Sequence, residues 1–287
     1  MAIDYDRLMA YQFPEIRHTL SKRDTAFYAL SCGMGADPMN EKQLDFVDFH
    51  RTMKIMPSMP VILGYPGMFA ADPATGINAV KVVHGEQNVT IHRPLPAEGE
   101  IIGRNRIVGL VDKGVDKGAL LFTERTIHDA QGQLLATAGA TVFLRGDGGF
   151  GGPAGPIPTP RALPTTKPDL VIDLPTRPEQ ALYYRLNGDE NPLHADPGFA
   201  ARAGFPRPIL HGLATMGVIC HALLAGLADY DPRKIAAMAL RFSAPVFPGE
   251  TITTEIWHDG SFRAKIAARD ALVATHGYVE ITNQARS

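Results

Sequence analysis

Apolar and polar residues alternate along several stretches of the chain, and this period of two predicts β-strands. The alternation covers residues 119–129, 134–145, 250–259, 261–270 and 271–282. Short turns separate these stretches, and the run His258-Asp259-Gly260-Ser261 is typical of a tight hairpin. Because successive hairpins place neighbouring strands side by side in opposite directions, the pattern predicts an antiparallel sheet.

Residues 213–228 follow a different pattern, since they are apolar on nearly every side of a helical period. A helix that is apolar all round is a buried helix. One buried helix wrapped by an antiparallel sheet is the hot-dog arrangement, so the predicted fold class is α+β. We expect each half of the chain to contain one apolar helix and several strands.

The two halves of the chain carry a weak internal repeat. Pro60-Val61-Ile62-Leu63-Gly64 resembles Pro208-Ile209-Leu210-His211-Gly212, and each run precedes an apolar segment. Later in each half, residues 89–102 and residues 240–252 both read as a strand, two prolines, Gly-Glu and a second strand. Two motifs in the same order and at similar spacing indicate a duplication. We therefore predict two tandem hot-dog folds that form a pseudo-dimer.

A stretch rich in glycine and then in proline lies near the middle of the chain and has the composition of a linker. It predicts a first domain over residues 1–147, a linker over residues 148–170 and a second domain over residues 171–287. The chain has 287 residues, 45% of them hydrophobic and 20% charged. These values suit two domains of moderate size, each with its own core.

Charge and cysteine content narrow the function. The formal net charge of -2 gives no reason to expect nucleic acid or an anionic membrane as a partner. The two cysteines, Cys32 and Cys220, form no C-x-x-C pattern, which argues against a disulfide framework or a zinc site. We see no apolar window long enough to span a membrane, no secretory signal and no S-K-L address, so we expect a cytoplasmic protein.

The chemically reactive residue types gather in residues 183–217. Asp189 follows Gly188 in a predicted turn, and Pro192 suits the first position of a helix. His194 comes five residues after Asp189, so the bend can bring both side chains to one cavity. A carboxyl beside an imidazole supplies a proton donor and a proton acceptor together. Addition of water across an activated double bond requires that combination.

His211 and Gly212 stand directly before the predicted buried helix. The first N–H groups of a helix have no internal acceptor and carry partial positive charge. A glycine at this position lets a ligand approach the backbone closely. The segment is therefore a candidate oxyanion hole for a carbonyl oxygen that gains negative charge.

The run YRLNGDENPLH (residues 184–194), followed by PILHG (208–212), resembles the signature of the hydratase 2 family within the MaoC-like dehydratases. Residues 84–87, 93–100, 143–152 and 248–250 are also similar to the two-domain form of this family, so the resemblance covers nearly the whole chain. It implies reversible hydration of trans-2-enoyl-CoA to (3R)-3-hydroxyacyl-CoA. It also implies that acyl-CoA is the substrate and that neither a metal nor a redox cofactor takes part.

The same resemblance assigns roles to residues. Asp189 and His194 match the catalytic pair, and Gly212 matches the glycine whose N–H binds the thioester oxygen. Asn191 and His211 are expected to support the site and to take part in binding the substrate. The counterpart in the first half, residues 28–35, has no such pair, so one site per chain is expected. In the family, this degenerate first domain makes room for the acyl tail.

Several alternatives remain open at this point. A hot-dog acyl-CoA thioesterase and a non-catalytic acyl-CoA-binding protein are the competing functions, and acyl-carrier protein could replace CoA as the carrier. A metal site built from Asp189, His194, Asp196 and His211 is conceivable, although none is expected. A homodimer of the pseudo-dimer is a further alternative. Because guanidinium groups suit phosphate, four arginines are candidate contacts for the CoA phosphates: Arg185, Arg202, Arg207 and Arg241.

Overall fold

The computed structural model describes residues 3–282, and its strands within this range form a single ten-stranded antiparallel sheet. The strands of the first half are β1 (Ile16–Leu20), β2 (Val82–Ile91), β3 (Gly99–Asp112), β4 (Ala119–Asp129) and β5 (Leu134–Leu144). Those of the second half are β6 (Leu170–Pro175), β7 (Ile235–Phe242), β8 (Thr251–Ile256), β9 (Ser261–Ile266) and β10 (Ala271–Ile281). The order across the sheet is β1-β3-β4-β5-β2-β7-β10-β9-β8-β6.

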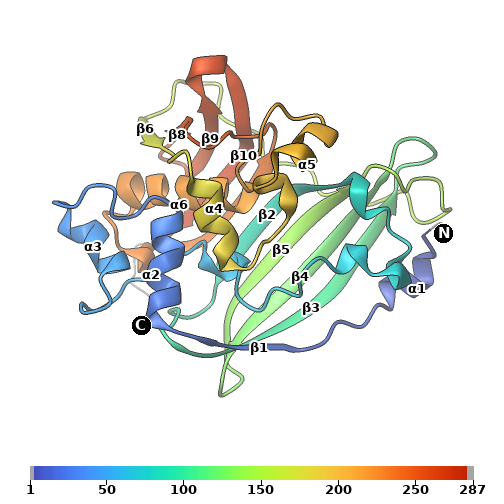
Figure 1. Cartoon of the computed structure of the whole chain (residues 1–287), viewed down its shortest axis with the longest axis horizontal. Coiled ribbons are helices and arrows are strands. Elements are labelled where there is room, and N and C mark those ends of the chain that lie inside the picture. The colour runs from blue at the N-terminus through green and yellow to red at the C-terminus, as the bar shows by residue number, and fades with distance from the viewer. Residues whose placement is uncertain (1–2, 283–287) are drawn as a thin grey trace.

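The two halves meet where β2 pairs with β7, so five strands from each half lie on either side of this seam (Figure 1). Gln87 lies opposite Leu240 across the seam, and Val89 lies opposite Met238. The Arg241 guanidinium also forms an ion pair with Glu86, its partner in the strand register. Backbone hydrogen bonds as well as side-chain contacts therefore join the two halves.

The buried helix of the second half is α6 (Gly212–Leu227), as the sequence predicts. It packs against the strands of its own half, since a Cβ added to Gly226 would lie 2.9 Å from the Ile172 side chain on β6. It also crosses α2 (Lys22–Ser31) of the first half at close range. A Cβ on Gly217 would lie only 2.2 Å from the Cys32 sulfur, so glycine is required at this crossing.

The segment after Gly64 differs from its counterpart after Gly212, where α6 begins. Only short 3₁₀ turns follow Gly64, because Pro66, Gly67, Pro73 and Gly76 interrupt the segment. Gly64 has a left-handed φ of 64°, and an added Cβ would lie 2.5 Å from the Gly103 backbone on β3. The glycine thus serves a close approach to the sheet. The helix of the first half that contacts α6 is α2, which precedes Pro60 in the chain and whose Tyr28 side chain lies near Gly217.

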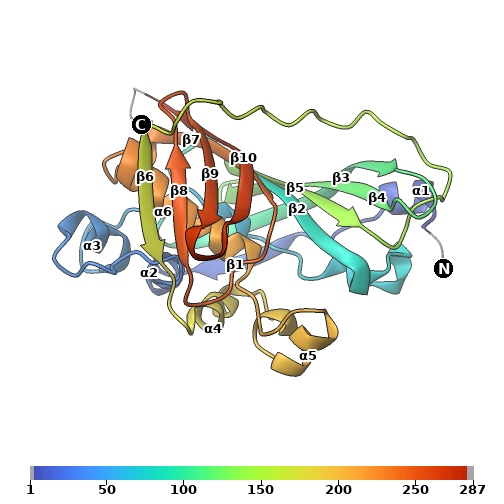
Figure 2. The same ribbon diagram turned by 90° about the horizontal axis from the view of Figure 1, so that it is seen from above.

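The remaining helices are short: α1 (Tyr5–Met9), α3 (Glu41–Val47), α4 (Gln180–Tyr184) and α5 (Pro197–Arg202). Residues 145–169 contain no helix or strand and run as an extended segment along the molecule between β5 and β6 (Figure 2). Both cysteines are buried and free. No helix among the described residues is long and apolar enough to cross a membrane.

Candidate active site

The loop that follows α4 positions Asp189 and His194. A 3₁₀ turn over residues 185–187 ends at Gly188, whose φ of 105° suits glycine, and the chain then reverses at Asp189. Asn191 caps a second turn: its side-chain oxygen accepts a hydrogen bond from the Leu193 N–H at 3.0 Å. Pro192 occupies the first position of that turn, where its missing N–H leaves nothing unpaired. His194 closes the turn.

His194 is held in one orientation. Its ring is buried, and its Nδ1–H donates to the Ile209 carbonyl oxygen at 2.8 Å. This bond fixes the tautomer and leaves the Nε2 lone pair available as a proton acceptor. The Asp189 carboxylate accepts a hydrogen bond from the Asn191 N–H at 3.3 Å. These two hydrogen bonds orient His194 and Asp189 but leave the His194 Nε2 and the Asp189 carboxylate able to exchange protons.

His211 lies against His194, with ring centroids 3.7 Å apart and planes at 28°. Its Nε2–H donates to the backbone oxygen of Asp189 at 3.2 Å, and its Nδ1 is buried without a partner among the described residues. The side-chain ligand atoms of Asp189, His194 and His211 all lie within 4.8 Å of one another. The three residues therefore form one cluster, which combines a carboxylate and two imidazoles.

Burial keeps both imidazoles neutral. It lowers the pKa of His194, an effect that the hydrogen bond to Ile209 and the charge of Asp189 oppose and the charge of Arg185 reinforces. Burial also lowers the pKa of His211 to about 3, with His194 adding to the shift. At neutral pH both imidazoles are therefore uncharged, and each can accept a proton.

Gly212 is the first residue of α6, and none of the described residues accepts a hydrogen bond from its N–H. A Cβ at this position would meet the Phe242 ring at 3.4 Å. The Phe242 ring in turn packs edge-on against His84 of β2, with centroids 5.2 Å apart. The start of α6 therefore faces an aromatic wall that both halves of the chain supply.

The first half contributes polar side chains around Asp189. Burial raises the pKa of Tyr65 and lowers that of His84, and the negative charge of Asp189 acts on both groups. The sequence resemblance includes His84 only within residues 84–87 and singles out neither Tyr65 nor Phe242. Phe242 lies within the repeat over residues 240–252, whereas Tyr65 lies in the loop after Gly64, and the pairing of β2 with β7 brings His84 to the Phe242 ring. The signal for them lies in the tertiary fold.

The four arginines predicted to bind CoA phosphates lie in different surroundings. Arg185 lies beside the cluster and donates to the Glu190 carbonyl oxygen, whereas Arg241 is engaged in its ion pair with Glu86. Arg202 is exposed on α5 above the Phe199 ring. Arg207 stacks on Phe247 and lines a hollow of about 200 Å³ that also includes His194. Arg185 and Arg207 are therefore the two that lie next to the cluster.

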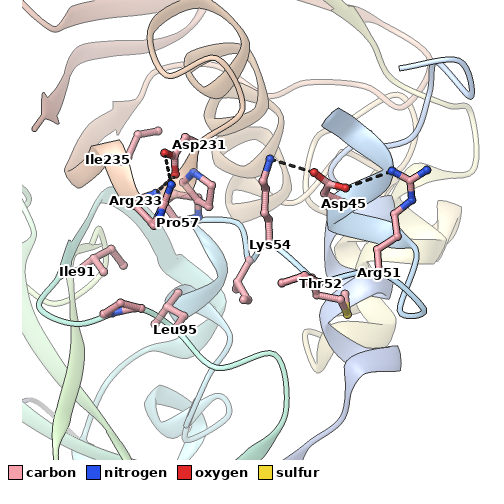
Figure 3. A pocket seen from close by; sticks show the side chains of 14 residues that line it. Asp45, Arg51, Thr52, Lys54, Pro57, Ile91, Leu95, Asp231, Arg233 and Ile235 are labelled. Carbon is pink, nitrogen blue, oxygen red and sulfur yellow. Dashed lines mark hydrogen bonds and ion pairs between the residues drawn. The ribbon is translucent and has the colours of Figure 1, made fainter. Parts of the chain in front are cut away.

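A larger cavity of about 690 Å³ lies elsewhere, at the opposite end of α6 (Figure 3). Ile55, Pro57, Leu95 and Ile235 supply much of its apolar lining. Its charged rim is already paired internally, through Lys54 with Asp45 and Arg233 with Asp231 (Figure 3). The cluster at the start of α6 and this cavity are separate features of the molecule.

The fold and the cluster define the protein as a double hot-dog protein with a carboxylate–imidazole site at the start of α6. The fold resembles that of a Mycobacterium tuberculosis protein described as having a double hot-dog fold, with a TM-score of 0.54 and 16% identity over 95% of this chain and 97% of that one. A MaoC-like dehydratase from Phytophthora capsici gives a TM-score of 0.86 and 34% identity, covering 99% of this chain and 100% of that one.

Comparison with family models identifies the particular family. The MaoC-like domain model matches residues 161–283, and the model of the N-terminal domain of multifunctional enzyme type 2 hydratase 2 matches residues 18–146. The peroxisomal enoyl-CoA hydratase 2 of Arabidopsis thaliana is 39% identical over 96% of this chain and 94% of its own length. The chain belongs to the hydratase 2 family of MaoC-like enzymes. This membership confirms the predicted family, the hot-dog fold class and the prediction of a hydratase or dehydratase.

Proposed function

We propose that the protein reversibly hydrates trans-2-enoyl-CoA to (3R)-3-hydroxyacyl-CoA, with Asp189 and His194 as the acid–base pair. The observation that carries this proposal is the cluster at the start of α6. An oriented imidazole with a free Nε2 and a carboxylate lie within 4.8 Å of each other, beside the unpaired N–H of Gly212. The match to a relative named enoyl-CoA hydratase 2 supports the same reaction class.

In this proposal the Gly212 N–H binds the thioester oxygen, which gains negative charge as the β-carbon is attacked. His194 and Asp189 hold one water molecule between them. The hydroxyl of this water forms a bond to the β-carbon, and a proton is delivered to the α-carbon, so the double bond becomes saturated without any other reactant. The two side chains exchange protons as one coupled unit, and both additions come from the same side.

We propose that the reaction needs no metal or redox cofactor. The ring geometry supports this, although the carboxylate and imidazole atoms are close enough together to suggest a metal site. An imidazole binds a metal along the lone pair in its own ring plane. The His194 and His211 planes are stacked 3.7 Å apart with an angle of only 28°, so one ion cannot lie close to both nitrogens in both planes.

We also propose that the acyl group lies against the first half of the chain and that Arg185 and Arg207 contact the CoA portion. The charge of Asp189 acts on Tyr65 and His84 of the first half, which supports the placement of the acyl group on that side. Arg207 lines the hollow that contains His194, and Arg185 lies beside the same ring. Arg207 is exposed and Arg185 is partly buried, and a guanidinium beside a site suits a phosphate.

The experiment is a spectrophotometric assay of the purified protein with crotonyl-CoA and trans-2-decenoyl-CoA. We expect loss of the absorbance of the conjugated enoyl thioester, together with formation of the (3R) alcohol on chiral analysis. Release of free CoA, measured with a thiol reagent, would instead indicate a thioesterase. Binding of both substrates without turnover would indicate an acyl-CoA-binding protein.

A further inference from the structure

Arg125 is a buried charge on the inward face of β4. The side chains of a strand alternate between its two faces, and Arg125 shares its face with Leu121 and Ile127, both fully buried. Its own exposed fraction is 8%. Its neighbour on β5, Ala138, is small and leaves room beside it. The pattern of β4 would place a valine or isoleucine here, so the arginine is an exception that requires an explanation.

The Arg125 guanidinium has no anionic partner. Its Nη2 donates to the Val61 carbonyl oxygen at 2.8 Å, whereas Nε and Nη1 are buried without any acceptor. No carboxylate of the described residues forms an ion pair with it, and its other recorded contact is the Tyr65 ring, 5.5 Å away. Burial lowers its pKa to about 10, so it remains charged at neutral pH. A buried unpaired charge is costly, and buried charges are ordinarily paired.

The position of Arg125 relates it to the cluster. Tyr65 lies against the guanidinium, and the charges of Arg125 and Asp189 act on Tyr65 in opposite directions. His84 likewise responds to both charges. His84 also packs on the Phe242 ring, which lies against Gly212. Arg125, Tyr65 and His84 all belong to the first half of the chain, the half against which the proposed acyl group would lie.

We propose that Arg125 binds a carboxylate on the acyl group, so that the substrates include enoyl-CoA thioesters of dicarboxylic acids. This inference rests on the proposed hydratase function and adds a substrate class to it. The Arg125 guanidinium would meet the two oxygens of a carboxylate through one of the nitrogens without a partner and the second N–H of Nη2, which together form one edge of its planar fork. The substrate carboxylate would supply the counter-charge that the chain itself lacks. Arg125 is thus a specificity residue and takes no part in proton transfer.

The test compares matched pairs of substrates that differ only at the far end of the acyl chain. Enoyl-CoA thioesters of C5, C6 and C8 dicarboxylic acids are measured against the monocarboxylic thioesters of equal length, for example trans-2-hexenedioyl-CoA against trans-2-hexenoyl-CoA. The readout is the ratio of kcat/KM for the two members of each pair. Because both substrates of a pair are measured with the same preparation, a fraction of misfolded protein lowers both kcat/KM values equally and leaves their ratio unchanged. We expect at least one diacid to be preferred by ten-fold or more.

Variants connect the preference to the guanidinium. In Arg125→Met the diacid-to-monoacid ratio should fall at least ten-fold, and in Arg125→Lys, which keeps the charge without the fork, it should fall less. Arg106→Met is the matched control, because Arg106 on the adjacent β3 is exposed and already paired with Glu124. Its ratio should equal that of the wild type.

The outcomes separate the two proposals. Turnover of monoacid thioesters with no preferred diacid, or a preference that survives in Arg125→Met, overturns the inference and leaves the hydratase function intact. In that case Arg125 would serve only to hold the backbone at Val61. Absence of turnover with every thioester would instead overturn the hydratase function itself.

Discussion

The His194 and His211 rings are stacked face to face, with centroids 3.7 Å apart, although the residues are far apart in the sequence. Each ring hydrogen-bonds to a backbone oxygen of the same loop system, His194 to that of Ile209 and His211 to that of Asp189. The stack therefore ties the loop that carries the acid–base pair to the first turn of α6. Because two positive charges at this distance would repel each other, the arrangement favours two neutral imidazoles.

The pH dependence of the reaction should reflect the neutral state of the His194 imidazole. If neutral His194 is the proton acceptor, kcat/KM falls only when His194 becomes protonated, and burial places its pKa below the ordinary value of about 6.5. We expect activity to stay level from pH 7 to below pH 6.5 and to decline at lower pH. Arg185 reinforces the lowered pKa, so Arg185→Gln should move the acid limb upward in pH. A limb centred above pH 6.5 in the wild type would contradict this account.

The acid–base pair should behave as a unit. Asp189→Asn and His194→Gln are each expected to lower kcat by roughly 10²–10⁴-fold, the usual contribution of a positioned acid or base. The double variant should fall little further, because either single change already breaks the coupled proton transfer. Steady-state kinetics with crotonyl-CoA measures this.

Asp196→Asn is the matched control for the pair. Asp196 is exposed and caps α5 by accepting a hydrogen bond from the Phe199 N–H, and an asparagine side chain can do the same. Its kcat should match that of the wild type. Losses that simply add in the double variant would show that Asp189 and His194 act independently.

The backbone of Gly212 offers a direct test of the oxyanion hole. Gly212 is the first residue of α6, a position that tolerates proline, and His211 has the extended ψ of 138° that a following proline requires. Gly212→Pro removes the N–H and should lower kcat by about 10²–10³-fold. Gly212→Ala keeps the N–H and should lose less, since its Cβ only touches Phe242. Thermal melting verifies that both variants fold. Equal losses in the two variants would indicate a steric effect.

Local sequence patterns predicted much of the second half. Alternation along residues 271–282 matched strand β10, and the stretch 261–270 matched β9 as far as Ile266, where a 3₁₀ turn over Ala267–Arg269 begins. The apolar run after His211 matched α6, because residues 214–224 of this helix are all buried. The loop motif also predicted that Asp189 and His194 lie close together, since Gly188 and Pro192 restrict the backbone between them.

Features that depend on the pairing of distant segments could not be predicted from the sequence. Gly64 repeats the glycine of the second-half motif, yet it serves an approach to Gly103 rather than the start of a helix. The pairing of β2 with β7 depends on the register of two distant segments, so the contact between His84 of β2 and Phe242 of β7 could not be predicted. Arg125 did leave a signal in the sequence, as a charge at an inward position of an alternating strand, but its lack of a partner is visible only in three dimensions.

His221 allows a test of buried charge apart from catalysis. It lies in the middle of α6, is 1% exposed and contacts the Tyr230 hydroxyl at 3.4 Å, and burial lowers its pKa to about 4. In the unfolded chain a histidine takes up a proton near pH 6.5, so between about pH 6.5 and pH 4 the unfolded state binds more protons. Stability should therefore fall as the pH drops through this window, and His221 alone accounts for about 2 kcal/mol between pH 7 and pH 5.

His221→Gln should flatten this dependence, because glutamine does not titrate. The free energy of unfolding, measured by urea denaturation at several pH values from 7 to 5, gives the slope for each protein. The variant can be less stable at pH 7, since it changes buried contacts, but its loss of stability on acidification should be smaller than that of the wild type. His194 and His211 are also buried with lowered pKa values and contribute a remaining slope to both proteins. An unchanged slope would mean that His221 takes up its proton equally well in the folded chain, by local opening of α6 near Tyr230.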